Sequence, residues 1–377
     1  MEIPERKGDL TMKILFWTVS HLPDLGGFQW STFRLAKSLK AFGHEVVFLT
    51  KTEQACHFDN GMPAIRMPCS DIQGWVLKSG RWILANTAIF NVLHVVDLFY
   101  QSIDSQIDFI LKSGKPNVVK IPTLGYVPKL INNSIRERFC SIDAFIALSD
   151  GIKEELIGCG VAGENIYLIP NGISTVDFSP ATDKQKAKYD LELPESKILI
   201  LFAGRLVWRK RVDILLEAMK KMPERFHLVI VGSSFGQRDS VEEQILQEAA
   251  KFGNITVRQA TADILKYYQA CDINVLLSER EGSPNSILEG MSCGMATVAT
   301  NIHGISNAIT NGEEGILVPV ADVGKTINAL LRVGSDRDLM SKMGQLARIR
   351  IQEKFAIEIV ANTYLDLYRN VSKRKGV

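Results

Sequence analysis

The fold is decided by the stretch ILILFAGRLVWRKRVDILLEAM (198–219), in which a short apolar run ends at Gly204 and passes through basic residues into a helix. The apolar run has the length of a buried strand. The same succession of strand-like and helical segments recurs before and after it along the chain. Apolar strands that alternate with helices are buried on both faces, so this pattern indicates a parallel α/β sheet.

Two such series follow each other. The first contains the runs KILFWTV (13–19), EVVFLT (45–50), NVLHVV (91–96), PNVVKI (116–121), AFIALS (144–149) and NIYLIP (165–170). The second begins at residue 198 and continues with HLVIVG (227–232), NITVRQ (254–259), INVLLS (273–278), ATVAT (296–300) and GILVPV (315–320). The polar stretch 171–197 between them predicts a linker and the entry to a second domain. We expect one domain over residues 12–180, a second over 181–355, and a last helix within 356–377 that packs back on the first.

Composition excludes several classes of protein. The 377 residues are 46% hydrophobic, and 44 basic against 42 acidic residues give a net charge of +2. This balance excludes intrinsic disorder and does not fit a nucleic-acid-binding protein. Six scattered cysteines without a C-x-x-C pair favour reduced thiols over a zinc ribbon or a disulfide framework.

The expected location is the cytoplasm. Residues 1–11 lack the apolar core of a signal peptide. The stretch WVLKSGRWIL (75–84) combines two tryptophans with Lys78 and Arg81, so peripheral contact with the inner membrane face is one interpretation. An ordinary amphipathic surface helix is the favoured one.

One segment combines the features of an anion site. It is SEREGSPNSILEGMSCG (278–294), which follows the apolar run 273–278 and therefore lies at the carboxyl end of a strand. Pro284 is typical of a helix start, and Asn285 and Ser286 are the expected caps. The amides of Ser286, Ile287 and Leu288 would then point into a cleft between the domains and suit a phosphate.

The same segment carries two carboxylates, Glu281 in the loop and Glu289 in the first turns of the helix. Their spacing does not place them on one helical face, so we expect them to contact different parts of one elongated ligand. A carboxylate accepts two hydroxyl hydrogen bonds, and each therefore suits a vicinal diol. The alternative is structural: a solvated Glu281, and a Glu289 that stabilises the helix dipole.

Basic residues follow the strand of the opening stretch. Arg205 and Lys210 come after Gly204, at the top of the strand and near the start of the next helix. Two cations there suit a diphosphate, through charge-assisted hydrogen bonds of about 1.5–3 kcal/mol each. The alternative is a solvated basic run over residues 209–211.

These segments resemble a known family. EGSPNSILEGMSCG (281–294) resembles the E-x7-E signature of the retaining glycosyltransferases of the GT-B fold, family 4, and GRLVWRKRVDILLEA (204–218) is similar to that family's G-R-L-x-x-x-K segment. Residues 21–50 resemble the family's opening Gly-Gly loop and helix, and residues 146–180 its domain-closing segment. The resemblance implies two tandem Rossmann-like, doubly wound domains that face each other across a cleft, with the C-terminal helix returning to the first.

The resemblance also implies residue roles. Arg205 and Lys210 would neutralise the diphosphate of a nucleotide sugar, Glu289 would hold the ribose hydroxyls, and Glu281 would contact hydroxyls of the donor sugar. The donor would further be lined by Gly26, Gly27, Gly204, Gly282, Ser283, Pro284, Asn285, Ser286 and Ile287. No side-chain nucleophile is implied, since the acceptor attacks on the face of the leaving group and a donor phosphate oxygen takes its proton.

The implied function is transfer of a sugar, with retention, from a nucleotide-diphosphate sugar to a hydroxyl of a glycan or lipid-linked acceptor in cell-surface polysaccharide synthesis. A UDP-hexose is the expected donor. No cofactor and no metal are expected, because Arg205 and Lys210 would supply the positive charge and the histidines lack ligand spacing. Asp336 and Asp338 form a D-x-D, but Ser335 before them indicates a helix cap.

Other functions remain open. The alternatives are a protein that binds nucleotide sugars without turnover and a GT-B epimerase that acts on the nucleotide sugar itself. A glycosidase is disfavoured, because it would not need Arg205 and Lys210 to bind phosphate. A dinucleotide-dependent oxidoreductase is disfavoured because no G-x-G-x-x-G follows the first strand.

The sequence departs from the family at NVLHVVD (91–97). Val96 stands where the family often has a second histidine, His94 has the position of a core residue, and Asp97 is a candidate substitute.

Overall fold

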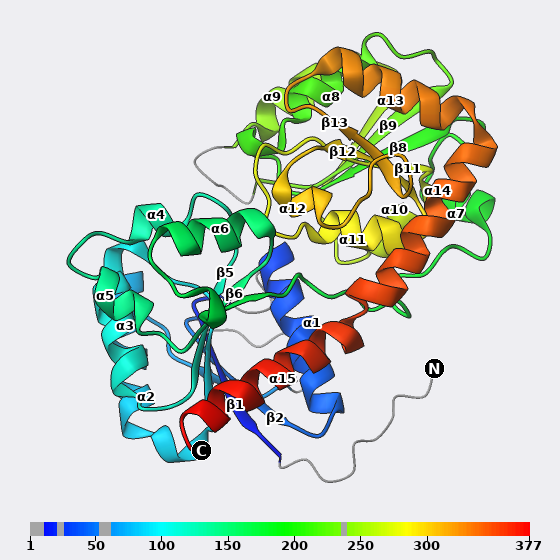
Figure 1. Ribbon diagram of the computed structural model, residues 1–377. Helices are drawn as coiled ribbons and strands as arrows, with labels where there is room; N and C mark the ends of the chain where they lie inside the picture. The colour runs from blue at the N-terminus through cyan, green and yellow to red at the C-terminus, as the bar shows by residue number, and fades with distance from the viewer. Residues whose placement is uncertain (1–10, 21–25, 53–61, 235–239) are drawn as a thin grey trace. The chain divides into compact units, whose positions relative to one another are not determined.

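The protein is described here by a computed structural model that covers residues 11–20, 26–52, 62–234 and 240–377 (Figure 1). The chain forms two compact units. Unit 1 contains the described residues up to 148, together with 152–169 and 361–377, and unit 2 contains 149–151 and 170–360. Apart from residues 149–151, the chain belongs to unit 2 from Pro170 to Val360, whereas the sequence predicts a boundary at residue 180.

Unit 1 is built on a seven-stranded sheet in the order β3-β2-β1-β4-β5-β6-β7, and every pairing is parallel. Its strands are β1 (Lys13–Thr18), β2 (Glu45–Thr50), β3 (Ala64–Arg66), β4 (Val92–Val95), β5 (Asn117–Ile121), β6 (Ala144–Ala147) and β7 (Ile166–Leu168). The chain order reverses between β1 and β4. All residues of β4, β5 and β6 are buried, including the polar His94, Asn117 and Lys120.

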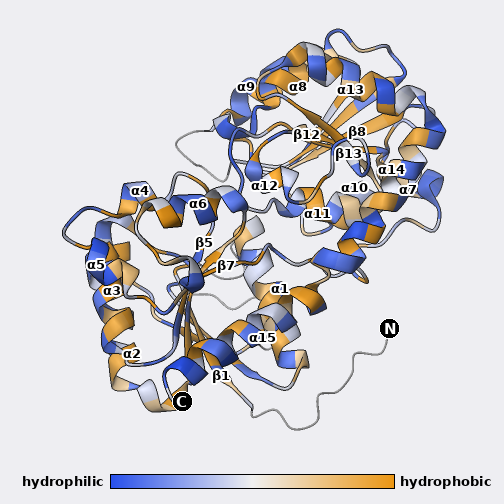
Figure 2. Ribbon diagram, viewed as in Figure 1, coloured by the Kyte–Doolittle hydropathy of each residue, from blue (hydrophilic) through white to orange (hydrophobic). Residues whose placement is uncertain are grey.

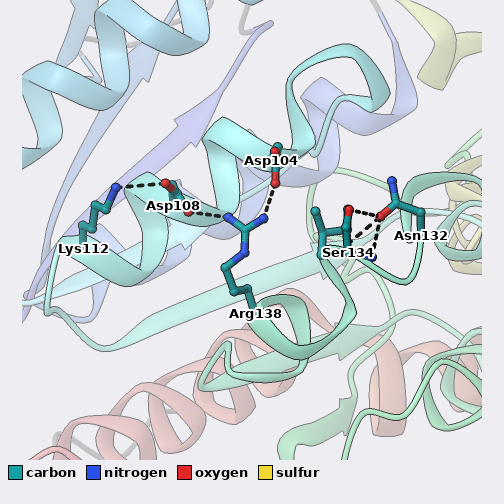
Figure 3. Close-up of polar contacts among 7 residues, drawn as sticks. Asp104, Asp108, Lys112, Asn132, Ser134 and Arg138 are labelled. Atoms are coloured by element: carbon teal, nitrogen blue, oxygen red, sulfur yellow. Dashed lines mark hydrogen bonds and ion pairs between the residues drawn. The ribbon is translucent and has the colours of Figure 1, made fainter.

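Helices connect these strands. They are α1 (Gly27–Ala41), α2 (Ile72–Ala85), α3 (Ile103–Lys112), α4 (Val127–Leu130), α5 (Arg136–Cys140) and α6 (Asp150–Gly158), with the 3₁₀ turns η2 (Thr87–Ile89), η3 (Tyr100–Ser102) and η4 (Gly163–Asn165). Arg138 of α5 binds both Asp104 and Asp108 of α3, and Lys112 binds Asp108 one turn further along (Figure 3). This ion network fastens α5 to α3.

The core of unit 1 includes the first tryptophan of WVLKSGRWIL. Trp75 of α2 is fully buried beside Trp17 of β1, and the Trp17 indole donates a 2.9 Å hydrogen bond to Ser79. Lys78 and Arg81 are exposed. The helix therefore uses Trp75 for packing, and Figure 2 shows the strands of both units as mostly hydrophobic.

The C-terminal helix α15 (Ile357–Arg374) belongs to unit 1 from Ala361 onward. Its Tyr368 hydroxyl lies 2.6 Å from Nδ1 of His94, and Tyr364 stacks on the same imidazole. His94 is thus a core residue in contact with α15.

Unit 2 is a second parallel sheet, of six strands in the order β10-β9-β8-β11-β12-β13. The strands are β8 (Ile198–Ala203), β9 (Phe226–Val231), β10 (Ile255–Arg258), β11 (Ile273–Leu276), β12 (Ala296–Thr300) and β13 (Gly315–Val318). The chain order reverses between β8 and β11. Two doubly wound parallel units confirm the fold class expected from the sequence.

The helical segments of unit 2 are α7 (Lys184–Asp190), η5 (Trp208–Lys210), α8 (Val212–Met219), α9 (Glu242–Ala249), α10 (Ile264–Ala270), α11 (Asn285–Ser292), α12 (His303–Ser306), α13 (Val323–Ser335), α14 (Arg337–Arg350) and the π-helical turn η6 (Ile351–Phe355). The D-x-D does cap a helix, but through Asp336, which accepts from the amide of Leu339. Ser335 instead accepts from the guanidinium of Arg225.

Candidate functional site

The two sequence motifs meet at the point where the strand order of unit 2 reverses. β8 and β11 are neighbours in the sheet, and the loops that follow them carry the basic motif and the first of the two glutamates. Loops at such a switch point form a crevice beyond the carboxyl ends of the strands, which is where open parallel sheets bind ligands. The topology therefore brings together residues that lie far apart in the chain.

Lys210 and Glu281 form a buried ion pair there. The Lys210 ammonium lies 2.5 Å from Oε1 of Glu281, and the guanidinium of Arg209 lies 3.7 Å from the same oxygen. The side chains of Lys210 and Glu281 are 11% and 10% exposed. The solvated alternatives for Glu281 and for the basic run therefore do not apply to this pair.

Burial and neighbouring charges together lower the pKa of both groups. Burial raises the pKa of the Glu281 carboxyl, but the charges of Lys210 and Arg209 outweigh burial, and the net pKa is below its ordinary value. Burial lowers the pKa of Lys210, and the nearby Arg209 and Arg205 lower it further, although Glu281 opposes them. Lys210 is thus a buried cation among like charges, which a bound anion would stabilise.

Backbone contacts fix the two loops against each other and against the sheet. The amide of Glu279 donates to the carbonyl of Arg209 at 2.9 Å. A side chain at Gly232, after β9, would meet the carbonyl oxygen of Gly204 at 1.9 Å. A side chain at Gly304 of α12 would meet the carbonyl oxygen of Glu281 at 2.3 Å. Both glycines are required because other backbone approaches closely.

Asn171 is a site residue that the motif analysis missed. Its amide donates to Ser283 Oγ at 3.1 Å, and its Nδ2 donates to the Ser283 carbonyl at 2.8 Å and to Asn285 Oδ1 at 3.0 Å. Asn171 thereby clamps the loop that enters α11. The signal was present in IPNGIS (169–174), where a polar Asn-Gly follows an apolar strand.

The start of α11 differs from the expectation. Pro284 is the N-cap residue, and neither Asn285 nor Ser286 caps the helix, because Asn285 is the first helical residue and its side chain accepts from Asn171. The amides of Ile287 and Leu288 both donate to the carbonyl of Pro284. These two amides therefore donate hydrogen bonds within the helix. They are not both free to bind an anion, although the sequence predicts an anion site at the amides of residues 286–288.

The second glutamate has a separate environment. Glu289 lies on α11 and is 8% exposed, and the hydroxyl of Tyr268 donates to its Oε2 at 2.9 Å. Tyr268 itself is buried against Phe178. The two glutamates thus have different partners within the protein.

Unit 1 holds the predicted residues Gly26 and Gly27 and the candidate Asp97. Gly26 is the N-cap residue of α1 and Gly27 its first helical residue, while residues 21–25 of the preceding loop lie outside the described part. Asp97 follows β4 at the reversal point of this sheet and accepts from the Thr18 hydroxyl and the Val19 amide. Burial raises the pKa of Asp97 to about 7 despite these two donors.

In residues 11–20, 26–52, 62–234 and 240–377, no cluster of three or more His, Cys, Asp or Glu side chains is arranged to bind a metal ion. No helix in that part of the chain has the length and apolarity needed to cross a membrane.

Comparison with known proteins shows the family. The model for Glycosyltransferase Family 4 matches residues 25–177, and that for Glycosyl transferases group 1 matches residues 183–350. The capsular polysaccharide biosynthesis glycosyltransferase CapM of Staphylococcus aureus is 24% identical over 62% of this chain and 63% of CapM. An N,N'-diacetylbacillosaminyl-diphospho-undecaprenol alpha-1,3-N-acetylgalactosaminyltransferase of Campylobacter jejuni is 27% identical over 65% of each chain. The chain thus matches somewhat less than two thirds of the length of these relatives.

The fold has solved counterparts. HepE of Anabaena, crystallised with UDP-glucose, superposes with a TM-score of 0.81 over 95% of this chain and 100% of HepE, at 17% identity. The two family models cover the two α/β units in succession, and the second includes both motifs of the site. The chain belongs to the group 1, family 4 glycosyltransferases of the GT-B fold.

Proposed function

We propose that this protein transfers a sugar from a nucleotide-diphosphate sugar to a hydroxyl of a glycan or lipid-linked acceptor, with retention of the anomeric configuration. The buried Lys210–Glu281 pair at the switch point of unit 2 carries the proposal. A buried lysine flanked by Arg205 and Arg209 is suited to two negatively charged phosphates, since charge-assisted hydrogen bonds are strongest where water is excluded.

Each polar group then has a place on the donor. Lys210 and Arg205 bind the diphosphate and stabilise the charge that develops as it leaves. Glu281 accepts hydrogen bonds from hydroxyls of the sugar. Glu289, oriented by its hydrogen bond from Tyr268, accepts hydrogen bonds from the ribose hydroxyls. Gly204 and the loop from Gly282 to Ser286 line the sugar and phosphates. Rate enhancement comes from leaving-group stabilisation and positioning, and the acceptor's proton passes to a donor phosphate oxygen.

Donor and acceptor are proposed from relatives. HepE was crystallised with UDP-glucose, so a UDP-hexose is the first donor to test. CapM is named for capsular polysaccharide biosynthesis, and the Campylobacter enzyme for an acceptor on undecaprenol diphosphate. We therefore propose an acceptor that belongs to a cell-surface glycan or its lipid-linked precursor. Contact with a membrane would then be peripheral.

A thermal-shift panel of UDP-, GDP-, ADP- and dTDP-sugars tests donor binding, because a ligand that binds the folded state raises the melting temperature. We expect one nucleotide class to stabilise the wild type and to have no effect on Lys210→Ala. The matched control is Lys266→Ala, which removes an equal charge from an exposed pair with Asp263. Failure of every nucleotide sugar to stabilise the wild type would reject the proposal.

Turnover separates a transferase from the alternatives. With the stabilising donor, release of nucleoside diphosphate should depend on added acceptor, whereas a binding protein or an epimerase would release none. We also propose that no metal is required, so activity should persist in EDTA. Recovery of a lost activity by magnesium or manganese alone would contradict that part of the proposal.

A further inference from the structure

The backbone of Arg211 is strained. It has φ 52° and ψ 42°, the left-handed conformation, at the junction of η5 and α8. Residues other than glycine are disfavoured there because their Cβ approaches the following carbonyl oxygen. Such a conformation persists only where surrounding contacts hold it, and these contacts often lie beside functional sites. Glycine would serve the backbone better, so the side chain must be the reason for an arginine here.

That side chain makes a bridge between two loops. Its Nε and Nη2 donate to the carboxylate of Asp213, in the first turn of α8, at 3.0 and 2.8 Å. Its Nη1 donates to Oε1 of Glu279, in the loop after β11, at 2.9 Å. The guanidinium also lies over the ring of Trp208, 5.1 Å from its centroid. With 13% exposure, it is held on several sides.

The bridge adjoins the proposed phosphate site on both strand-end loops. Arg211 directly follows Lys210, and Glu279 lies two residues before Glu281. The backbone bond from Glu279 to the Arg209 carbonyl joins the same two loops. Because two carboxylates already balance the guanidinium, Arg211 acts on the ligand through its neighbours rather than by direct contact.

We propose that Arg211 is a positioning residue, whose bridge between Asp213 and Glu279 holds Lys210 against Glu281 in the geometry that binds the donor diphosphate. This inference rests on the proposed function. The strained backbone is the cost of directing the guanidinium across to the loop after β11.

Three variants of the full chain test the bridge. Arg211→Gly relieves the strain and deletes the bridge, so we expect an unchanged or raised melting temperature together with UDP affinity at least about tenfold weaker, the loss expected from about 1.4 kcal/mol. Glu279→Gln removes one end of the bridge without changing the backbone at residue 211, and should weaken UDP binding in the same direction. Arg211→Lys keeps a charge that can reach one carboxylate at a time, and should give an intermediate affinity.

Ala321→Gly is the matched control. Ala321 also has a positive φ, of 60°, but it lies between β13 and α13 and belongs to neither loop. This change should raise the melting temperature slightly and leave UDP affinity unchanged. Equal weakening by Ala321→Gly would mean that loss of backbone strain, not loss of the bridge, alters binding, and the inference would be wrong.

The outcomes distinguish this inference from the function on which it rests. A stable Arg211→Gly protein with wild-type UDP affinity overturns the inference alone. Should Arg211→Gly fail to fold, Glu279→Gln decides, and wild-type affinity in that variant overturns it. If the wild type binds none of UDP, GDP, ADP and dTDP in isothermal titration, the proposed donor site fails and the inference fails with it.

Discussion

Lys210 and Glu281 are 71 positions apart in the chain, yet the lysine Nζ lies 2.5 Å from a carboxylate oxygen of the glutamate. Both side chains are about nine-tenths buried. In such a pair each charge replaces the water that the other has lost. The pair is therefore the centre of the proposed donor site, and the stability of unit 2 depends on it.

Removal of one partner should destabilise the protein. Glu281→Ala leaves a buried ammonium without its carboxylate, and we expect a loss of about 3–5 kcal/mol in the free energy of unfolding, measured in urea. The double change Lys210→Met with Glu281→Leu removes both charges and should recover most of that loss. Neither protein should bind a nucleoside diphosphate. Wild-type stability in Glu281→Ala would show that the pair is not buried in solution.

Asn171 should matter for both the loop and the ligand. Asn171→Ala deletes the two donors of Nδ2, which hold Ser283 and Asn285, so we expect a loss of about 1–3 kcal/mol in unfolding free energy and weaker donor binding. Asn86→Ala is the control, since it deletes a comparable side-chain bond to the Trp82 carbonyl in unit 1. The control should lose stability without a change in nucleotide affinity. Equal effects on affinity would remove Asn171 from the site.

His94 should make stability depend on pH. Burial, with a smaller effect from Lys120, lowers the pKa of His94 from 6.5 to about 3. Between these values the unfolded chain binds more protons than the folded one, so this contribution to stability falls as pH decreases below 6.5, by about 2 kcal/mol at pH 5. In His94→Gln, where the amide can still bond the Tyr368 hydroxyl, the fall in urea stability from pH 7 to 5 should be smaller by that amount.

Asp97 should make stability depend on pH in the direction opposite to His94, over a similar pH range. Its pKa is raised from 3.8 to about 7, so the folded state binds more protons between these values and its contribution falls as pH increases. As pH rises from 4 to 7, the stability of Asp97→Asn relative to wild type should therefore increase. Over the same rise, the stability of His94→Gln relative to wild type should decrease. Parallel profiles for the two variants would contradict the assignment of these shifts.

Gly304 should be intolerant of a side chain. In Gly304→Ala the new Cβ would lie 2.3 Å from the Glu281 carbonyl oxygen, so the loop must move and donor affinity should fall. Gly158→Ala is the control, because its Cβ would meet nothing within 4 Å at the end of α6. That change should leave affinity unaltered and stabilise by up to about 1 kcal/mol through helix propensity. Unchanged binding in Gly304→Ala would show that the loop yields without consequence.

Periodicity was enough for the architecture. Short apolar runs separated by helical segments specify parallel strands because a strand buried on both faces has no polar side. The expected runs at residues 13–19, 198–204 and 273–278 each contain a strand of the structure. Local rules failed where a side chain had a distant partner. Asn285 has the chemistry of a cap, but its side-chain oxygen accepts a hydrogen bond from Asn171 instead.

The sequence by itself determined the fold class, the family resemblance and the two motifs after the apolar runs 198–204 and 273–278, since these depend on residue type and local spacing. Only the tertiary structure decided which residues meet. Strand order placed β8 beside β11 and so joined Lys210 to Glu281, and the return of the chain at Pro170 brought Asn171 onto Ser283. The tertiary structure also revealed the strained backbone of Arg211 and the bridge from its side chain to Asp213 and Glu279. Such contacts depend on the pairing of strands distant in the chain, which no local pattern of residues encodes.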